Sequence, residues 1–183
     1  MKIYTFGAED APVLLLLPGT CCHWKSNFGA VIPLLADSFR VLCVSYDGFD
    51  ETEQTEFSTM LEETKKIEAY LKNHCGGHIR AAYGCSLGGA CLTHFLALGK
   101  IPVKCAVIDA GITPYQMPLI LRRLACLRDF WGFSLITKSR KILEAAYPPE
   151  RWTLPGCDPV KEYDALAAYL KTYSKHTIRN IFR

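Results

Sequence analysis

The feature that most constrains the fold of this chain is a series of short apolar segments separated by segments of helical character. Three of these segments predict buried strands, Val13–Leu17, Arg40–Ser45 and Val103–Asp109, and His78–Tyr83 predicts a further short strand. A continuous apolar run is typical of a strand that is covered on both faces. Strands that alternate with helices predict a mostly parallel sheet with flanking helices. The first part of the chain is therefore expected to be an α/β domain.

The segments around these strands complete the pattern. Lys2–Phe6 alternates weakly and predicts an edge strand. Residues 24–36 have helical spacing, although Pro33 predicts a late start or a kink. A stripe of side chains on one face predicts a further helix that stops at Gly76-Gly77. The members of this stripe are Phe57, Met60, Leu61, Thr64, Ile67 and Leu71.

The last third of the chain has a different character. No convincing strand is found there, and helix-like segments are expected at about 116–130, 133–146 and 158–173. We therefore predict two domains, an α/β core over residues 1–111 and a helical region over residues 112–183.

Charge divides the chain in the same place. Residues 1–111 carry 9 Lys and Arg against 12 Asp and Glu, whereas residues 112–183 carry 12 against 6. The basic half has no nucleic-acid motif, and its charges fall at helical spacing, so we interpret it as a solvated helix face and expect no nucleic-acid partner. The longest aliphatic run has five residues and no secretory signal is evident, so we expect no membrane partner.

The nine cysteines indicate a reducing compartment. Their number is odd, they form no paired C-x-x-C motif, and most lie inside apolar stretches. We interpret them as reduced core thiols of a cytoplasmic protein, and we expect neither a metal site nor a cofactor.

The candidate catalytic residue lies in the segment Tyr83-Gly84-Cys85-Ser86-Leu87-Gly88-Gly89. It contains a G-x-S-x-G motif between a predicted strand and a helix that runs to about Gly99. Such a sharp turn holds the serine in a strained conformation, and Gly84 and Gly88 remove the side chains that would collide there. The hydroxyl of Ser86 is then exposed beside a helix N-terminus, which favours negative charge. The alternative interpretation is a glycine-rich helix cap with an incidental serine.

A second segment, Leu14 to Trp24, contains Pro18-Gly19-Thr20 directly after a buried strand. With this turn and the serine motif together, the chain resembles the α/β-hydrolase superfamily over about residues 1–111. The resemblance implies an oxyanion hole made by the backbone N–H groups of Thr20 and Leu87. It also matches Asp47-Gly48 to the turn after the family's next strand.

The resemblance leaves the rest of the triad open. In the family an acid and then a histidine follow later strands, and no such strands are found before Arg183, so we expect the last strands to be missing and the base to lie beyond this residue. Asp109 is a candidate for the acid, or else a strand-end aspartate that caps the next turn. None of the five histidines is assigned as the base. They are His23, His74, His78, His94 and His176.

The helical region fits the family's cap, which would supply an apolar ceiling over the active site. The alternative is that its apolar side chains serve helix packing only. The residues in question are Pro114, Tyr115, Met117, Pro118, Leu119, Ile120, Phe130, Trp131 and Phe133.

We predict a serine hydrolase that cleaves a carboxylic ester or similar acyl bond of a small molecule through Ser86. Without a base, the serine of this chain is expected to be a poor catalyst. The alternative is a non-catalytic binding protein that retains the serine turn. Because nothing after Val103–Asp109 is predicted to be a strand, this strand has an open edge, and we expect a homodimer through it unless the helical tail covers it.

Overall fold

The computed structural model of the chain describes residues 1–111, 118–152 and 158–182. The chain divides into two compact units, Met1–Tyr115 and Gln116–Arg183. This division lies slightly after the predicted boundary at residues 111 and 112, within a segment outside the described residues.

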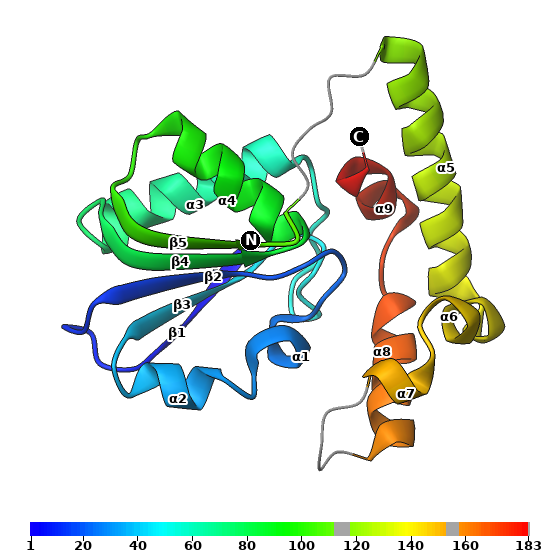
Figure 1. Ribbon diagram of the computed structural model, residues 1–183, viewed down its shortest axis with the longest axis horizontal. Coiled ribbons are helices and arrows are strands. Elements are labelled where there is room, and N and C mark those ends of the chain that lie inside the picture. Colours follow the sequence, from blue (N-terminus) through cyan, green and yellow to red (C-terminus); the bar gives the residue numbers. More distant parts are fainter. Residues whose placement is uncertain (112–117, 153–157, 183) are drawn as a thin grey trace. The chain divides into compact units, whose positions relative to one another are not determined.

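The first unit is built on a five-stranded sheet with the strand order β1-β3-β2-β4-β5 (Figure 1). β1 pairs antiparallel with β3 at one edge, and every other pair is parallel. The predicted strands and the mostly parallel sheet are confirmed, with the strand predicted at His78–Tyr83 shifted toward its C-terminal end. The burial predicted for Val103–Asp109 is wrong: six of its seven residues are exposed, because this strand lies at the edge of the described sheet. The strands are β1 (Lys2–Phe6), β2 (Val13–Leu17), β3 (Arg40–Ser45), β4 (Ile79–Cys85) and β5 (Val103–Asp109).

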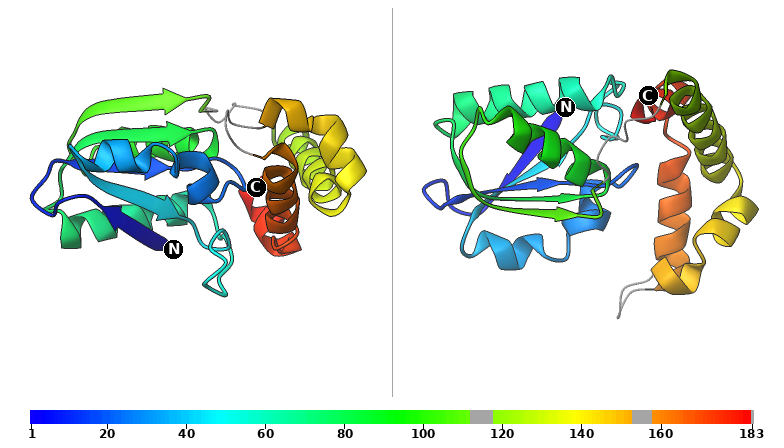
Figure 2. Two further views of the ribbon diagram at one scale, coloured as in Figure 1. Left: turned by 90° about the horizontal axis from the view of Figure 1, so that it is seen from below. Right: turned by 45° about the horizontal axis from the view of Figure 1, so that its top comes forward.

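Helices flank both faces of this sheet, α1 and α2 on one face and α3 and α4 on the other (Figure 2). The segment predicted as one kinked helix is two short helices, because Pro33 occupies the first turn of the second one, where a missing N–H costs no hydrogen bond. The helices are α1 (Trp24–Phe28), α2 (Ile32–Ala36), α3 (Met60–His74) and α4 (Leu87–Leu98).

The helix α3 corrects one detail of the predicted apolar stripe. Leu61 is 47% exposed and does not belong to the core, whereas Ile67 and Leu71 are buried as expected. The helix stops at the predicted glycines: both have positive φ, and the N–H of Gly77 donates to the carbonyl of Leu71 at 3.1 Å.

The described residues of the second unit contain helices and no strand, as predicted. The break predicted between residues 130 and 133 is wrong, because α5 runs through Gly132 without interruption. The segment α9 was not expected as a separate helix. The five helices are α5 (Leu119–Lys138), α6 (Arg140–Ala146), α7 (Pro149–Trp152), α8 (Pro159–Leu170) and α9 (Lys175–Ile181). Across both described units, no helix is long and apolar enough to cross a membrane.

The cysteines are less uniformly buried than expected. Of the eight in the described residues, all of which are free thiols, Cys21, Cys43 and Cys91 are buried and Cys105 is exposed. The other four are half-buried. The interpretation as core thiols therefore holds for only part of the set, since Cys105 lies on the edge strand β5.

Candidate active site

Two loops leave the same end of the sheet from neighbouring strands. β2 and β4 are parallel and paired in register, with Leu17 opposite Gly84, so the segments that follow them start side by side. A Cβ atom added to Gly19 would lie 3.6 Å from the Cβ of Ser86. The turn after β2 therefore packs against the serine, at the sheet end where α/β proteins place their ligands.

Ser86 has a backbone conformation that side-chain-bearing residues rarely adopt, with φ 51° and ψ −111°. Two hydrogen bonds hold it in place. Its N–H donates to the carbonyl of Asp109 at 2.8 Å, and its carbonyl accepts from the N–H of Ala90 at 3.0 Å. Because β4 ends at Cys85 and α4 begins at Leu87, Ser86 is the single residue between strand and helix.

The glycines around Ser86 allow this turn to be tight. A Cβ atom on Gly84 would lie 2.3 Å from the carbonyl oxygen of Gly88, and one on Gly88 would lie 2.1 Å from that of Leu17. Both distances are far below van der Waals contact, so only glycine fits at either position. Gly84 and Gly88, predicted as the glycines of the serine turn, thus bring α4 against β2.

The loop after β2 is ordered by a short set of hydrogen bonds. The N–H of Cys22 donates to the carbonyl of Gly19 at 3.3 Å, with Cys21 at φ 51° between them. The N–H of Gly19 donates to the Asn27 side chain on α1 at 3.0 Å. Sequence reasoning missed Asn27, because no motif marks an asparagine inside a helix as the partner of a loop.

The two predicted oxyanion donors have unengaged N–H groups. Within the described part of the chain, neither the N–H of Thr20 nor that of Leu87 donates to another residue. Leu87 is the first residue of α4, where an N–H has no intrahelical acceptor. Neither N–H group therefore has an acceptor among the described residues.

The thiols near the serine are poor nucleophiles. Burial raises the pKa of Cys22 to about 11, and burial together with the charge of Asp109 raises the pKa of Cys85. Both groups stay protonated at neutral pH, and the thiol is much less reactive than the thiolate. Ser86 is half-buried, and no described side chain hydrogen-bonds to its hydroxyl.

His23 lies in the loop after β2, but its ring nitrogens are engaged elsewhere. Nδ1 accepts the N–H of Lys25 at 3.1 Å and so caps α1, and Nε2 lies 2.8 Å from a carboxylate oxygen of Glu51. Burial lowers the pKa of His23, although Glu51 opposes this. The neutral ring with its proton on Nε2 satisfies both contacts, which is a structural role.

The other histidines lie away from Ser86 or outside its unit. His94 is eight residues along α4 from Ser86, roughly 12 Å at 1.5 Å per residue. His74 and His78 each contact a backbone carbonyl of their own segment, at 3.0 and 3.3 Å. His176 belongs to α9 of the second unit. Within Met1–Tyr115, no described histidine hydrogen-bonds to the Ser86 hydroxyl.

Asp109, the candidate acid, ends β5 directly beside the serine turn. Its carboxylate accepts a hydrogen bond from the Tyr83 hydroxyl at 2.6 Å, which raises the pKa of Tyr83 to about 12. Its backbone carbonyl is the acceptor for the N–H of Ser86. Asp109 therefore positions the serine through its main chain. Tyr83 was not predicted to contribute, although it immediately precedes the G-x-S-x-G motif.

Metal binding is not supported by the side chains in view. Among the described residues, no group of three or more His, Cys, Asp or Glu side chains is placed to hold a metal ion.

The three predicted ceiling residues Pro114, Tyr115 and Met117 lie outside the described residues. Of the other members, Leu119, Ile120 and Trp131 are more than half exposed.

A parallel sheet whose strained serine lies between a strand and a helix defines a class of protein, the α/β hydrolases. Residues 12–137 match the family described as having the alpha/beta hydrolase fold. The chain belongs to this family.

Solved structures show the same fold at low sequence identity. A protein from Desulfitobacterium hafniense described as an α/β-hydrolase family member is 17% identical, with a TM-score of 0.73, over 99% of this chain and 70% of that one. MenH from S. aureus is also 17% identical, with a TM-score of 0.71, over 100% and 69%. An esterase from Rhodococcus sp. ECU1013 is 18% identical, with a TM-score of 0.69, over 99% and 68%.

The chain therefore spans about 70% of the length of these structures, and its sheet ends at β5 in the described residues. No curated protein matches the chain.

Proposed function

We propose that this chain carries the nucleophile and oxyanion hole of a serine hydrolase that cleaves a carboxylic ester or a similar acyl bond. The observation that carries the proposal is the strained backbone of Ser86, which is held between β4 and α4 by close glycine contacts. Strain of this kind persists where the surrounding structure enforces it, and it is concentrated at active sites. A serine in an ordinary loop or helix cap has no need of it.

In the proposed reaction the Ser86 oxygen attacks the acyl carbon, and the carbonyl electron pair moves onto oxygen. The N–H groups of Thr20 and Leu87 hold this oxyanion, a contribution worth roughly 3 kcal/mol for each donor in related chemistry. The proton of Ser86 passes to a general base, which then protonates the leaving alcohol. Water subsequently cleaves the acyl-enzyme and regenerates the serine.

The general base is the missing part of this scheme. The histidines of Met1–Tyr115 are bound to other groups or lie too far along their helix, as described above. We propose that the base is not one of these four residues.

The helical unit is the proposed cap, whose variation would set the choice of substrate.

A fluorophosphonate probe tests the proposal, because it reacts with serine hydroxyls activated for nucleophilic attack. We expect slow labelling of the chain, lost in Ser86→Ala and retained in Ser38→Ala, a matched change at an exposed loop serine. Labelling that survives Ser86→Ala would contradict the assignment of the nucleophile. Rapid labelling of residues 1–183 alone would instead place a base within this chain, with His176 and Asp109 the first residues to substitute.

A second function is favoured by one specific observation. No described side chain hydrogen-bonds to the Ser86 hydroxyl, as expected of a binding protein that kept the turn and does not catalyse. A complete absence of labelling of the unsubstituted chain, with the same thermal unfolding curve with and without the probe, would support this alternative over the hydrolase.

A further inference from the structure

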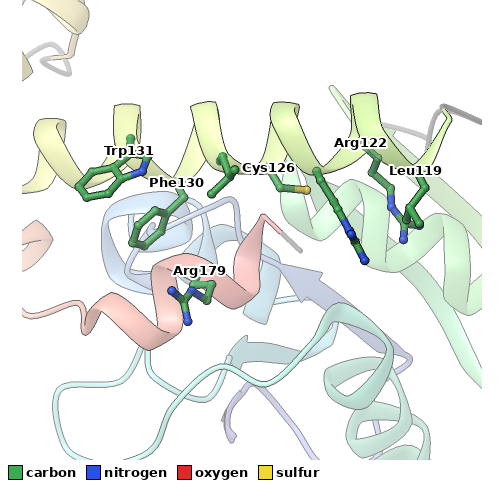
Figure 3. A pocket seen from close by; sticks show the side chains of 8 residues that line it. Leu119, Arg122, Cys126, Phe130, Trp131 and Arg179 are labelled. Carbon is green, nitrogen blue, oxygen red and sulfur yellow. The ribbon is translucent and has the colours of Figure 1, made fainter.

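The helical unit contains a cavity of about 480 Å³ between α5 and α9 (Figure 3). This volume lies in the range typical of small-molecule sites. All of its lining residues belong to the helical unit, so the cavity is defined without reference to Ser86. They are Leu119, Arg122, Arg123, Cys126, Leu127, Phe130, Trp131 and Arg179.

Three guanidinium groups line this cavity and no carboxylate does. Among the described residues, Arg122, Arg123 and Arg179 form no ion pair with an acidic side chain. The acidic residue closest in sequence to Arg122 and Arg123 is Asp129, which forms an ion pair with Arg128 at 2.8 Å. A lining that carries three positive charges and no negative one favours an anionic ligand. The planar fork of arginine suits the two oxygens of a carboxylate or phosphate.

The lining also carries aromatic and aliphatic side chains. Phe130 and Trp131 meet edge to face with 5.4 Å between ring centroids, and Trp131 is 62% exposed. The Arg179 guanidinium lies 5.8 Å from the centroid of the Phe130 ring, which ties the charged part of the cavity to the apolar part. Exposed aromatic side chains beside a hollow are typical of a binding surface.

Helical spacing explains why one helix supplies both kinds of side chain. Cys126 and Leu127 lie three and four residues after Arg123 and four and three residues before Phe130, so these side chains share one face of α5. Arg179 approaches this face from α9, which packs against α5. The basic charges of the helical unit were interpreted from sequence as a solvated face, and the structure places three of them around a cavity.

We propose that this cavity binds a small amphipathic organic anion, with a carboxylate or phosphate held by arginines of the lining and an apolar body against Phe130 and Trp131. A purely inorganic anion would leave the aromatic side unoccupied. A neutral apolar molecule would leave the three charges uncompensated.

Isothermal titration calorimetry of the full chain tests this proposal with four probes: decanoate, phenyl phosphate, decan-1-ol and inorganic phosphate. We expect decanoate or phenyl phosphate to bind at least tenfold more tightly than decan-1-ol and inorganic phosphate. Tighter binding of decanoate would identify a fatty-acid-like ligand, and tighter binding of phenyl phosphate an aromatic phosphate. Equal affinity for decanoate and decan-1-ol, or binding of inorganic phosphate alone, would overturn the proposal.

Substitutions then localise the binding. Arg179→Gln and Arg123→Gln should each weaken the preferred probe at least tenfold, whereas Arg128→Gln, on the same helix but outside the lining, should leave it unchanged. Circular dichroism spectra identify any variant that does not fold. If one of the two lining variants fails to fold, the other still tests the proposal. An equal loss in all three variants would show nonspecific charge attraction. Binding to vesicles of anionic phospholipid without competition by either soluble anion would point to a membrane surface and contradict the proposal.

Discussion

The two units bury their apolar side chains to different extents. In the sheet unit, Leu15, Leu42 and Val44 have no exposed surface. In the helical unit, Leu124 and Trp131 on α5 are more than half exposed. Strands covered by helices on both faces have a closed interior, whereas a long helix that packs along part of its surface keeps apolar side chains outside. The sheet unit thus buries its apolar side chains internally, whereas α5 of the helical unit leaves several of them exposed.

Among the strands of the sheet unit, β5 differs from this pattern. β5 is the edge strand opposite β1, and most of its residues are exposed, with Val107 at 50% and Ile108 at 45%. Only its β4 side is hydrogen-bonded within the sheet. Among the described residues no strand pairs with its other side, which leaves those backbone groups for pairing with another strand.

The largest change in stability is expected when one glycine in each unit is substituted and the two results are compared. Gly88→Val places a branched side chain where even a Cβ would lie 2.1 Å from a backbone oxygen, so we expect a loss of about 3 kcal/mol or more in the free energy of unfolding. Gly132→Ala on α5 meets open space and should instead stabilise by about 0.5–1 kcal/mol. Urea denaturation measures both, and an unchanged midpoint for Gly88→Val would mean that the serine turn is not tightly packed.

A second contrast concerns leucines. Leu42→Ala empties a fully buried site in β3 and should cost about 2–4 kcal/mol. Leu124→Ala on α5 removes a side chain that is 57% exposed and should change stability by less than about 0.5 kcal/mol. Equal losses at the two positions in denaturant unfolding would show that the exposed face of α5 is covered in solution.

The open edge of β5 predicts self-association. We expect the 20.5 kDa chain to form a homodimer at high concentration, and Val107→Lys to weaken it at least tenfold, or about 1.4 kcal/mol, since a charged side chain discourages edge pairing. Val160→Lys, at an exposed position on α8, is the matched control. Light scattering that finds only the monomer for the unsubstituted chain would exclude pairing through this edge.

The smallest effect is a pH dependence from His23. Burial lowers its pKa in the folded protein, so below its ordinary value the unfolded chain binds more protons and stability falls as the pH is lowered. The neighbouring Glu51 and Asp50 oppose this shift, and Lys25 adds to it. His23→Asn keeps a helix-capping side chain. This substitution should reduce the dependence of the melting temperature on pH between pH 7 and 5. The same substitution at the exposed His78 should leave the slope as it is.

Much of the sheet unit could be predicted because its signals are local. An apolar run such as Val13–Leu17 marks a buried strand by itself, and the glycines around Ser86 mark a tight turn wherever it lies. The helical unit was predicted less well. A periodic pattern shows that a helix exists, but Gly132 was not enough to decide whether α5 breaks there, because a helix tolerates one exposed glycine at modest cost.

The sequence by itself determined the strands along the chain, the family and the position of the serine turn, because each depends on residues close together in the chain. Only the tertiary structure decided which distant groups meet. It placed the carbonyl of Asp109 on the N–H of Ser86, the Tyr83 hydroxyl on the carboxylate of Asp109, and Arg179 beside Phe130. No periodicity records such contacts, since they arise from strand pairing and helix packing between segments far apart in the chain.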